Sequence, residues 1–245
     1  MPEELEIGLN ALGKVKIIYT GDLHGNVEKM QYISTVVKGL RGDSHDTLLL
    51  DSGDWSKGSP INDKFAGKPM ADIMDYLRYD ALALGEEDLS WGIRGLKKLA
   101  AASGIPFLCC NLKGEPAPAF IKPFVIKDLV NIRVAVVGVS PVVKLPERHF
   151  TMLEPEQALK AVLAEVQKED PAITVLLSHL GIESDRKLAA LFPNLALIIG
   201  GHSHIRTEKP EKVGPVLIVH SGAHGDYVGS LELDIGNVLT LRSKE

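Results

Sequence analysis

Short runs of β-branched residues and leucine recur along the chain, separated by longer stretches with helical periodicity. Each run is only four or five residues long, and most are typical of strands buried on both faces of a sheet. The runs lie at residues 15–19, 47–50, 81–84, 106–110, 133–137, 173–177, 195–199 and 216–219. Helical patterns cover residues 27–38, 69–79, 93–102, 155–168 and 184–191. This alternation predicts a layered α/β fold.

Two regions depart from the strict alternation of strands and helices. Residues 119–137 and 213–241 both have the pattern of consecutive strands without a helix between them. A mixed sandwich of two sheets therefore fits better than one parallel sheet. Residues 113–118 contain a glycine and two prolines and are predicted to form a loop between strands. With 245 residues, no internal repeat and no long linker, residues 1–245 are expected to form a single domain.

Composition excludes several classes of function. Hydrophobic residues make up 45% of the chain, but no stretch approaches the roughly 20 apolar residues that span a bilayer, so membrane insertion is not expected. The net charge is −5 and no Lys/Arg run is longer than a pair, which argues against nucleic-acid binding. The adjacent Cys109 and Cys110 are expected to be small buried residues. The acidic start lacks a secretory pattern, so we expect a cytoplasmic protein, or a periplasmic or extracellular one if a leader was removed.

Side chains that can bind metal follow five of the apolar runs, at the point where each strand would end. In open α/β sheets ligands collect at the carboxyl ends of the strands, so these five clusters are expected to meet in one crevice. Glycines around them allow sharp turns and close approach of a ligand. The candidate residues in these clusters are Asp22, His24, Asp54, Glu86, Glu87, His179, His202 and His204.

The chemistry of these side chains indicates transition metals. Aspartates and four histidines suit Zn, Mn or Fe better than Ca, which prefers oxygen ligands almost alone. Asp22 and His24 are two residues apart and can face one ion, and His202 and His204 repeat that spacing. More than four ligands indicate two ions. Taken singly, Asp54 could be a helix cap and each histidine a loop residue bonded to backbone, but five ordered clusters favour a metal site.

In this order the motifs resemble those of the calcineurin-like metallophosphoesterase superfamily, and within it the catalytic domain of the 5′-nucleotidase family. The matching segments are Gly-Asp-Leu-His-Gly at 21–25, Ser-Gly-Asp-Trp-Ser-Lys-Gly-Ser-Pro at 52–60, Ser-His-Leu-Gly at 178–181 and Gly-Gly-His-Ser-His at 200–204. The resemblance covers nearly the whole chain. It implies a four-layer α/β/β/α sandwich of two mixed sheets flanked by helices, and a phosphorylated small-molecule substrate.

The same resemblance implies residue roles. Asp22, His24 and His204 would hold one divalent ion. His179 and His202 would hold the other, and Asp54 would bridge the pair. A hydroxide between the ions would attack the phosphorus atom, and the cations would neutralise the charge that builds there.

The third motif departs from the family's usual Gly-Asn-His-Glu-Phe-Asp-x-Gly, because residues 85–92 read Gly-Glu-Glu-Asp-Leu-Ser-Trp-Gly. Glu86 takes the place of the asparagine ligand. Glu87 takes the place of the histidine that stabilises or protonates the leaving group, and Ser90 that of the aspartate orienting it. The alternative is that residues 86–88 form only a solvated acidic helix start. Asn111 could line the pocket, although an asparagine that ends a strand is more often a turn residue.

Charge counting shows the expected consequence. Two divalent ions offset by Asp22, Asp54 and a hydroxide leave +1, an ionised Glu86 leaves zero, and an ionised Glu87 leaves −1. A like charge about 4 Å from a phosphate costs roughly 1 to 4 kcal/mol. Loss of a positioned general acid costs roughly 10² to 10⁴ in rate. Altered or reduced phosphoesterase activity is therefore expected, unless Glu87 stays protonated and acts as the acid or the leaving group needs none.

Two further hypotheses follow from the substituted motif and the length of the chain. One is a catalytically inactive metal-binding or scaffold domain. The other is a domain of a larger protein whose remaining part recognises the substrate, because the family's nucleotidases carry a C-terminal domain that grips the base and ribose. Nucleotide specificity is therefore not transferred to this chain.

Overall fold

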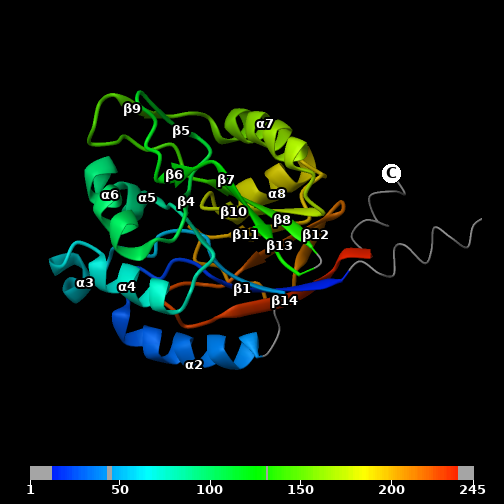
Figure 1. Ribbon diagram of the computed structural model, residues 1–245, viewed down its shortest axis with the longest axis horizontal. Coiled ribbons are helices and arrows are strands. Elements are labelled where there is room, and N and C mark those ends of the chain that lie inside the picture. Colours follow the sequence, from blue (N-terminus) through cyan, green and yellow to red (C-terminus); the bar gives the residue numbers. More distant parts are fainter. Residues whose placement is uncertain (1–12, 43–45, 131, 237–245) are drawn as a thin grey trace, which may run out of the picture.

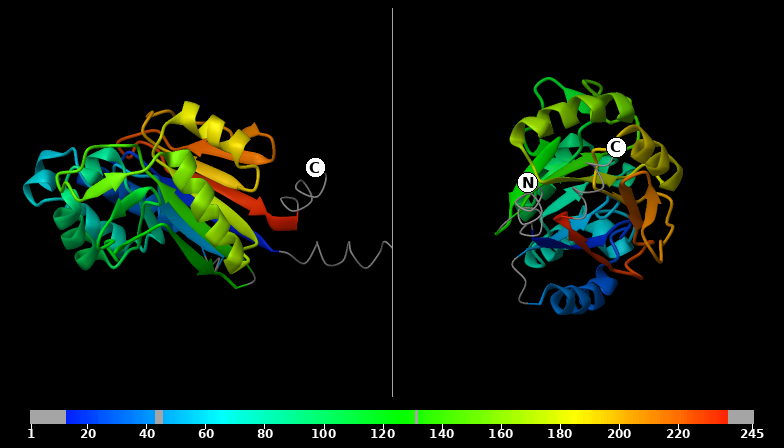
Figure 2. Two further views of the ribbon diagram at one scale, coloured as in Figure 1. Left: turned by 90° about the horizontal axis from the view of Figure 1, so that it is seen from above. Right: turned by 90° about the vertical axis from the view of Figure 1, so that its right-hand side faces the viewer.

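Two six-stranded sheets pack face to face between two layers of helices (Figure 1). The computed structural model describes residues 13–42, 46–130 and 132–236. Helix α2 lies outside the first sheet and helices α7 and α8 lie outside the second, as the end-on view in Figure 2 shows. The fold is the predicted four-layer sandwich of two mixed sheets with flanking helices.

The first sheet has the strand order β14-β1-β2-β3-β4-β6. Its strands β1, β2, β3, β4 and β6 run parallel, and β14 pairs antiparallel with β1 at one edge. Their bounds are β1 Lys14–Thr20, β2 Thr47–Asp51, β3 Ala81–Ala83, β4 Phe107–Leu108, β6 Ile121–Lys122 and β14 Gly229–Asp234.

The second sheet has the order β12-β13-β11-β10-β8-β7. Strands β8, β10, β11 and β13 are parallel, and the edge strands β7 and β12 are antiparallel to their neighbours. The bounds are β7 Phe124–Asp128, β8 Arg133–Val139, β10 Ile173–Ser178, β11 Leu197–Gly200, β12 Glu211–Val213 and β13 Val216–His220. A separate two-stranded ladder pairs β5 (Leu112–Gly114) with β9 (Phe150–Met152).

Helices cover the outer faces of both sheets. Their bounds are η1 Val27–Lys29, α2 Met30–Arg41, α3 Pro60–Lys64, α4 Lys68–Tyr76, α5 Glu86–Leu89, α6 Gly92–Ser103, α7 Pro155–Val166, η2 Gln167–Glu169 and α8 Ile182–Leu191. Helices α3 to α6 gather at one end of the molecule, at the left in Figure 1. Pro155 begins α7, as predicted, because its missing N–H would have no partner in the first turn.

The apolar strands are buried on both faces, which explains why they read as continuous hydrophobic runs. In β1, Ile17 and Tyr19 belong to the core between the sheets, whereas Ile18 packs on the side of the helices. In β2, Leu48 and Leu50 face the other sheet and Leu49 faces the helices. A third core lies between the second sheet and helices α7 and α8.

Each of the eight predicted strands and five predicted helices has a counterpart in the structure. The prediction of consecutive strands is confirmed by β6, β7 and β8 and by β13 and β14, while residues 237–241 lie outside the described part of the chain. The predicted loop at 113–118 is wrong at its start. Residues 113 and 114 belong to β5, because their backbone pairs with β9.

Within the described ranges, no helix is both long and apolar enough to cross a bilayer.

Candidate metal centre

The carboxyl ends of five parallel strands meet at one place, and each carries candidate ligands. Strands β1, β2 and β3 of the first sheet lead into Asp22 and His24, into Asp54 and into Glu86. Strands β10 and β11 of the second sheet lead into His179 and into the loop with His202 and His204. All seven predicted metal ligands lie in three overlapping groups whose ligand atoms are within 4.8 Å of one another.

The first group joins Asp22, His24 and His204. The Nε2 atoms of the two histidines are 3.0 Å apart, and Asp22 Oδ1 lies 3.5 Å from Nε2 of His204 and 4.0 Å from Nε2 of His24. Asp22 is buried, and burial raises the pKa of its carboxyl above the ordinary value although nearby histidines and a hydrogen bond oppose the shift. Burial lowers the pKa of His24, which favours the neutral imidazole that a metal needs.

The second group joins Glu86, His179 and His202. Glu86 Oε1 lies 2.7 Å from Nδ1 of His202, and Glu86 Oε2 lies 3.1 Å from Nε2 of His179. On the other side of its ring, Nδ1 of His179 lies 2.8 Å from the carbonyl oxygen of Ser52. A carbonyl can only accept, so Nδ1 carries the proton and, in the neutral ring, Nε2 presents its lone pair to the site.

Asp54 links the two groups. Its Oδ2 lies 3.2 Å from Nε2 of His179, and Asp22 Oδ1 lies 3.8 Å from the same nitrogen. The other oxygen of Asp54 accepts a hydrogen bond of 2.8 Å from the backbone N–H of Glu87. Asp54 thus forms a third candidate group with Asp22 and His179, which are members of the other two groups.

Two buried polar atoms that face opposite charges without an aligned hydrogen bond fit a bound cation at this place. Nε2 of His179 is fully buried and, like Oε2 of Glu86, makes no aligned hydrogen bond with any residue that the structure describes. Burial disfavours an imidazolium here, but the carboxylates of Asp54, Glu86 and Asp22 outweigh it and raise the pKa of His179 well above its ordinary value. Burial alone would raise the pKa of Glu86, yet His179 and His202 lower it to about 2. The carboxylates that favour a proton on His179 would equally stabilise a metal cation at this place.

Two glycines make room for this packing. A Cβ on Gly85 would lie 2.0 Å from Oδ1 of Asp54, and a Cβ on Gly53 would lie 2.7 Å from Nδ1 of His179. Gly53 also has φ of +107°, a value that side chains rarely tolerate. Both glycines are therefore required by the approach of Asp54 and His179.

Asp88 is a buried residue that the sequence analysis treated only as part of an acidic helix start. It is fully buried and accepts hydrogen bonds from the backbone N–H groups of Gly85, Asp54 and Ser56 and from the Ser56 hydroxyl. Burial raises its pKa to about 7. Asp88 thus ties the loop that carries Asp54 to the start of α5, so the interpretation of residues 86–88 as a merely solvated helix start is wrong.

The third motif brings Glu87 and Ser90 together with Lys57. The Glu87 carboxylate lies 3.2 Å from Nζ of Lys57, and the same ammonium donates to the Ser90 hydroxyl at 2.7 Å. Ser90 in turn donates to the backbone oxygen of Glu87 at 2.5 Å. Glu87 is the predicted catalytic residue and belongs to none of the three ligand groups. That role stays a prediction.

Two further histidines lie near the site and were not predicted. The ring of His224 is 5.0 Å from that of His24 and 5.4 Å from that of His204, and its backbone N–H donates to Asp22. His220 lies behind the loop of His202 and is bonded to the buried Asp185 at 2.8 Å. His220 ends β13 and His224 follows it by four residues. Both were missed because no matching motif covers this segment.

Asn111 and the two cysteines are buried residues that contribute to the fold. Asn111 is buried and bonds to both the backbone N–H and the carbonyl of Ser140 and to the carbonyl of Leu153, which favours the turn interpretation. Cys109 and Cys110 are buried, as predicted, and burial raises the pKa of the Cys109 thiol to about 11.

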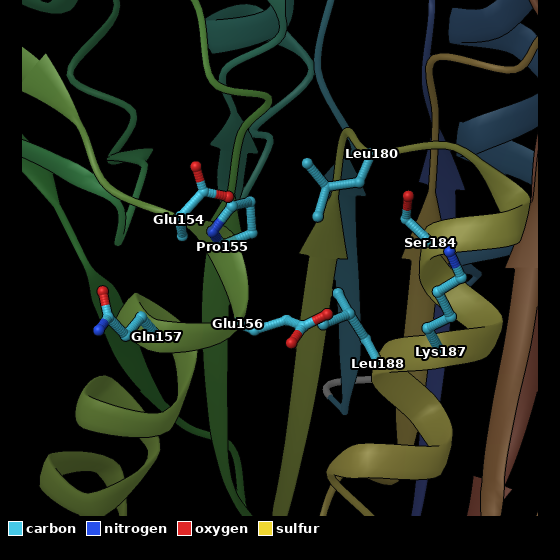
Figure 3. A pocket seen from close by; sticks show the side chains of 8 residues that line it. All are labelled: Glu154, Pro155, Glu156, Gln157, Leu180, Ser184, Lys187 and Leu188. Carbon is cyan, nitrogen blue, oxygen red and sulfur yellow. The ribbon is translucent and has the colours of Figure 1, made fainter.

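One cavity of the molecule opens at the candidate centre, and another lies between two helices of the outer layer. One of about 380 Å³ is lined by His24 and His224 and opens beside the first ligand group. Another of about 520 Å³ lies between α7 and α8, and Figure 3 shows Glu156 and Leu188 facing each other across it. The side chains that line this second cavity include Lys187 and Ser184 but none of the candidate metal ligands. The chemistry of the site therefore belongs to the strand ends and the first cavity.

Fold and site together define a metallophosphoesterase, and the chain belongs to the calcineurin-like phosphoesterase family, whose pattern matches residues 15–206.

Proteins of the 5′-nucleotidase type are among its relatives. The chain is 29% identical to the uncharacterized metallophosphoesterase YunD of Bacillus subtilis over 92% of this chain and 51% of the relative. It is 25% identical to human 5′-nucleotidase over 93% of this chain and 48% of that protein. The chain thus spans about half the length of the curated relatives it matches.

Solved structures share the fold. The NAD nucleotidase NadN of Haemophilus influenzae matches with a TM-score of 0.82 at 18% identity, over 90% of this chain and 47% of that one. A 5′-nucleotidase precursor from Thermus thermophilus matches with a TM-score of 0.80 at 21% identity, over 91% of this chain and 52% of that one.

Proposed function

We propose that this protein hydrolyses phosphate esters of small molecules with two divalent metal ions. Asp22, His24 and His204 would hold one ion, and Glu86, His179 and His202 the other, with Asp54 bridging them. The observation that carries the proposal is the buried Nε2 of His179, which faces Asp54 and Glu86 without an aligned hydrogen bond. The similarity to relatives of the 5′-nucleotidase type supports the choice of phosphate esters.

The protein's own residues would prepare this reaction. When bound, the ions would supply an activated water and neutralise negative charge on the phosphoryl group. The hydrogen bond that Nδ1–H of His179 donates to the carbonyl oxygen of Ser52 fixes the His179 ring. Asp88 fixes the loop of Asp54, and the Glu87 N–H fixes one oxygen of the Asp54 carboxylate. These groups are held before any substrate arrives, which lowers the cost of reorganisation during reaction.

Exchange of Asp54 tests the proposal. The Asp54→Asn variant is expected to lose metal and to lower hydrolysis of an activated aryl phosphate by more than about 10²-fold, because even partners behind metal ligands cost 10- to 100-fold. Asp72→Asn, at an exposed position on α4, is the matched control and should retain both properties. Metal content and turnover would be measured after loading with Mn, Zn or Fe. A wild-type protein that binds two ions and hydrolyses no ester would contradict the proposal.

An inactive metal-binding or scaffold domain is the second candidate, because Glu87 and Ser90 replace the family's usual histidine and aspartate. Anomalous scattering from metal-loaded crystals would show whether Glu86 contacts an ion in either case. Substantial turnover that Asp54→Asn abolishes would exclude the inactive alternative.

A further inference from the structure

Lys57 places a positive charge where the family's usual motif has its leaving-group histidine. Its ammonium lies 3.2 Å from Oε2 of Glu87 and 2.7 Å from the hydroxyl of Ser90, the two residues that replace the histidine and aspartate. The same ammonium lies 5.6 Å from the centre of the Trp91 ring. Three partners from one helical segment therefore hold the end of a flexible side chain.

This ammonium is close to the bridging carboxylate in the network of contacts. Glu87 donates its backbone N–H to Asp54 at 2.8 Å and receives Lys57 on its side chain. Lys57 is also only three residues after Asp54 in the same loop. The Lys57 side chain is 32% exposed, so its ammonium is open to a ligand from solvent.

Lys57 changes the charge balance of the site. With two divalent ions, Asp22, Asp54, Glu86, a hydroxide and an ionised Glu87, the count is −1, and Lys57 returns it to zero. An ammonium has three N–H donors, and its contacts with Glu87 and Ser90 use two of them. One donor remains for a phosphate oxygen, and lysine is a common ligand of phosphate.

We propose that Lys57 is a catalytic residue that donates a hydrogen bond to the phosphoryl or leaving-group oxygen, and that Glu87 and Ser90 are positioning residues for it. This proposal rests on the proposed function and identifies which side chain meets the substrate. In this proposal the Glu87 carboxylate orients the Lys57 ammonium and does not take over the role of the histidine.

The reaction balances without any further reactant. The water oxygen forms a new bond to phosphorus, the ester P–O bond breaks, and its electron pair leaves with the alkoxide oxygen. The two protons of the water end on the alcohol and on the phosphate product. Lys57 stabilises the negative charge that builds on the oxygens during this exchange and is unchanged at the end.

Conservative substitutions of Lys57 test the proposal. Lys57→Gln, Lys57→Arg and the control Lys68→Gln, at an exposed position on α4, would be compared with wild type after Mn loading. The measurements are kcat and KM for aryl phosphates with a series of leaving groups, binding of inorganic phosphate by calorimetry, and metal content.

We expect Lys57→Gln to lower kcat by about 10²-fold, the loss typical of one donor to a developing oxyanion. The loss should grow as the leaving group becomes poorer, and phosphate binding should weaken by about tenfold while metal content stays unchanged. Lys57→Arg should recover part of kcat because it keeps the charge.

Three results would overturn the proposal. Lys57→Gln could equal Lys68→Gln in both kcat and phosphate binding. The loss of kcat in Lys57→Gln could be the same for every leaving group, with no recovery in Lys57→Arg. The Lys57→Gln variant could also lose metal or unfold together with Lys57→Arg, which would mark Lys57 as structural. If wild type binds two ions but hydrolyses no ester, the proposed function fails, and phosphate binding alone still decides the role of Lys57.

Discussion

Glu87 gives the start of α5 a second carboxylate beside Glu86, but the two point to different partners. Glu86 contacts His179 and His202 inside the candidate metal centre, whereas Glu87 contacts Lys57 at its rim. One acidic residue thus belongs to the ligand set and the other to the surrounding groups. Neighbouring residues of the same chemistry have separate roles here because the helix turns them apart.

A histidine at residue 87 and an aspartate at residue 90 should raise activity towards esters with poor leaving groups. In the double variant Glu87→His with Ser90→Asp, an imidazole replaces one carboxylate and the new aspartate adds another, so the net charge is unchanged. The new aspartate can orient the imidazole and can pair with Lys57, which loses Glu87 and Ser90 as partners. We expect kcat for an alkyl phosphate to rise by about 10² or more, the usual contribution of a positioned acid. Steady-state kinetics on alkyl and aryl phosphates would measure it. An unchanged rate would indicate Glu86 or the pocket shape as the obstacle.

The candidate ligands at the strand ends could be predicted from the sequence. Residues that act through long-range contacts could not. Asp22, His24 and His204 could be grouped because a matching motif and a strand end mark each one. Lys57 and Asp88 could not, because their roles depend on contacts over 30 to 34 positions that only the fold creates.

Strand β8 comes close to the first sheet, and Gly138 is the reason. A Cβ at Gly138 would lie 2.4 Å from Cβ of Leu108 and 2.5 Å from its backbone oxygen, in β4 of the other sheet. The backbone N–H of Cys110 also donates to the carbonyl of Gly138 at 2.7 Å. The two sheets are thus joined at this point by direct backbone contact.

Gly138→Ala should therefore destabilise the protein, because neither backbone can move away easily. We expect a loss of about 1 to 3 kcal/mol in the free energy of unfolding, the range for overpacked cores. Urea denaturation of metal-free protein would measure it, with Gly39→Ala on the open surface of α2 as the control. Because alanine is the better helix former, the control should be neutral or slightly stabilised. A Gly138→Ala variant no less stable than the control would show that the sheets can separate locally.

The elements that the sequence missed are short and lack an apolar pattern of their own. Helices α3 and α5 have only five and four residues, and strands β5 and β9 have three each. Segments of this length bury too little apolar surface to form alone. Their structure comes from neighbours, as when Asp88 holds the start of α5 and β9 pairs with β5.

At the scale of the whole molecule, one core contains residues from both sheets. Val15, Leu48 and Ala81 come from the first sheet, and Val134 and Val175 come from the second. Neither sheet can leave this core without exposing the apolar face of the other. This shared core supports the proposal of a single domain, of which the structure describes residues 13–42, 46–130 and 132–236.

Unfolding of the whole chain is therefore expected to occur in one transition. Trp55 is fully buried on the helix side of the first sheet, so its fluorescence reports on that half, while far-UV circular dichroism reports on both sheets. The two urea curves of metal-free protein should coincide. Two separated midpoints would show that the halves unfold as independent units.

Six residues around the candidate centre have left-handed backbone conformations that side chains adopt at a cost: Asp22, His24, Asp54, His202, His204 and His224, with φ between 48° and 70°. These turns direct the candidate ligands towards one place, and the backbone of the fold already holds them there. We therefore expect metal binding to require little movement of the backbone. Loops with ordinary backbone conformations would be more stable, and the fold gives up that stability for ligands that are held in place in advance.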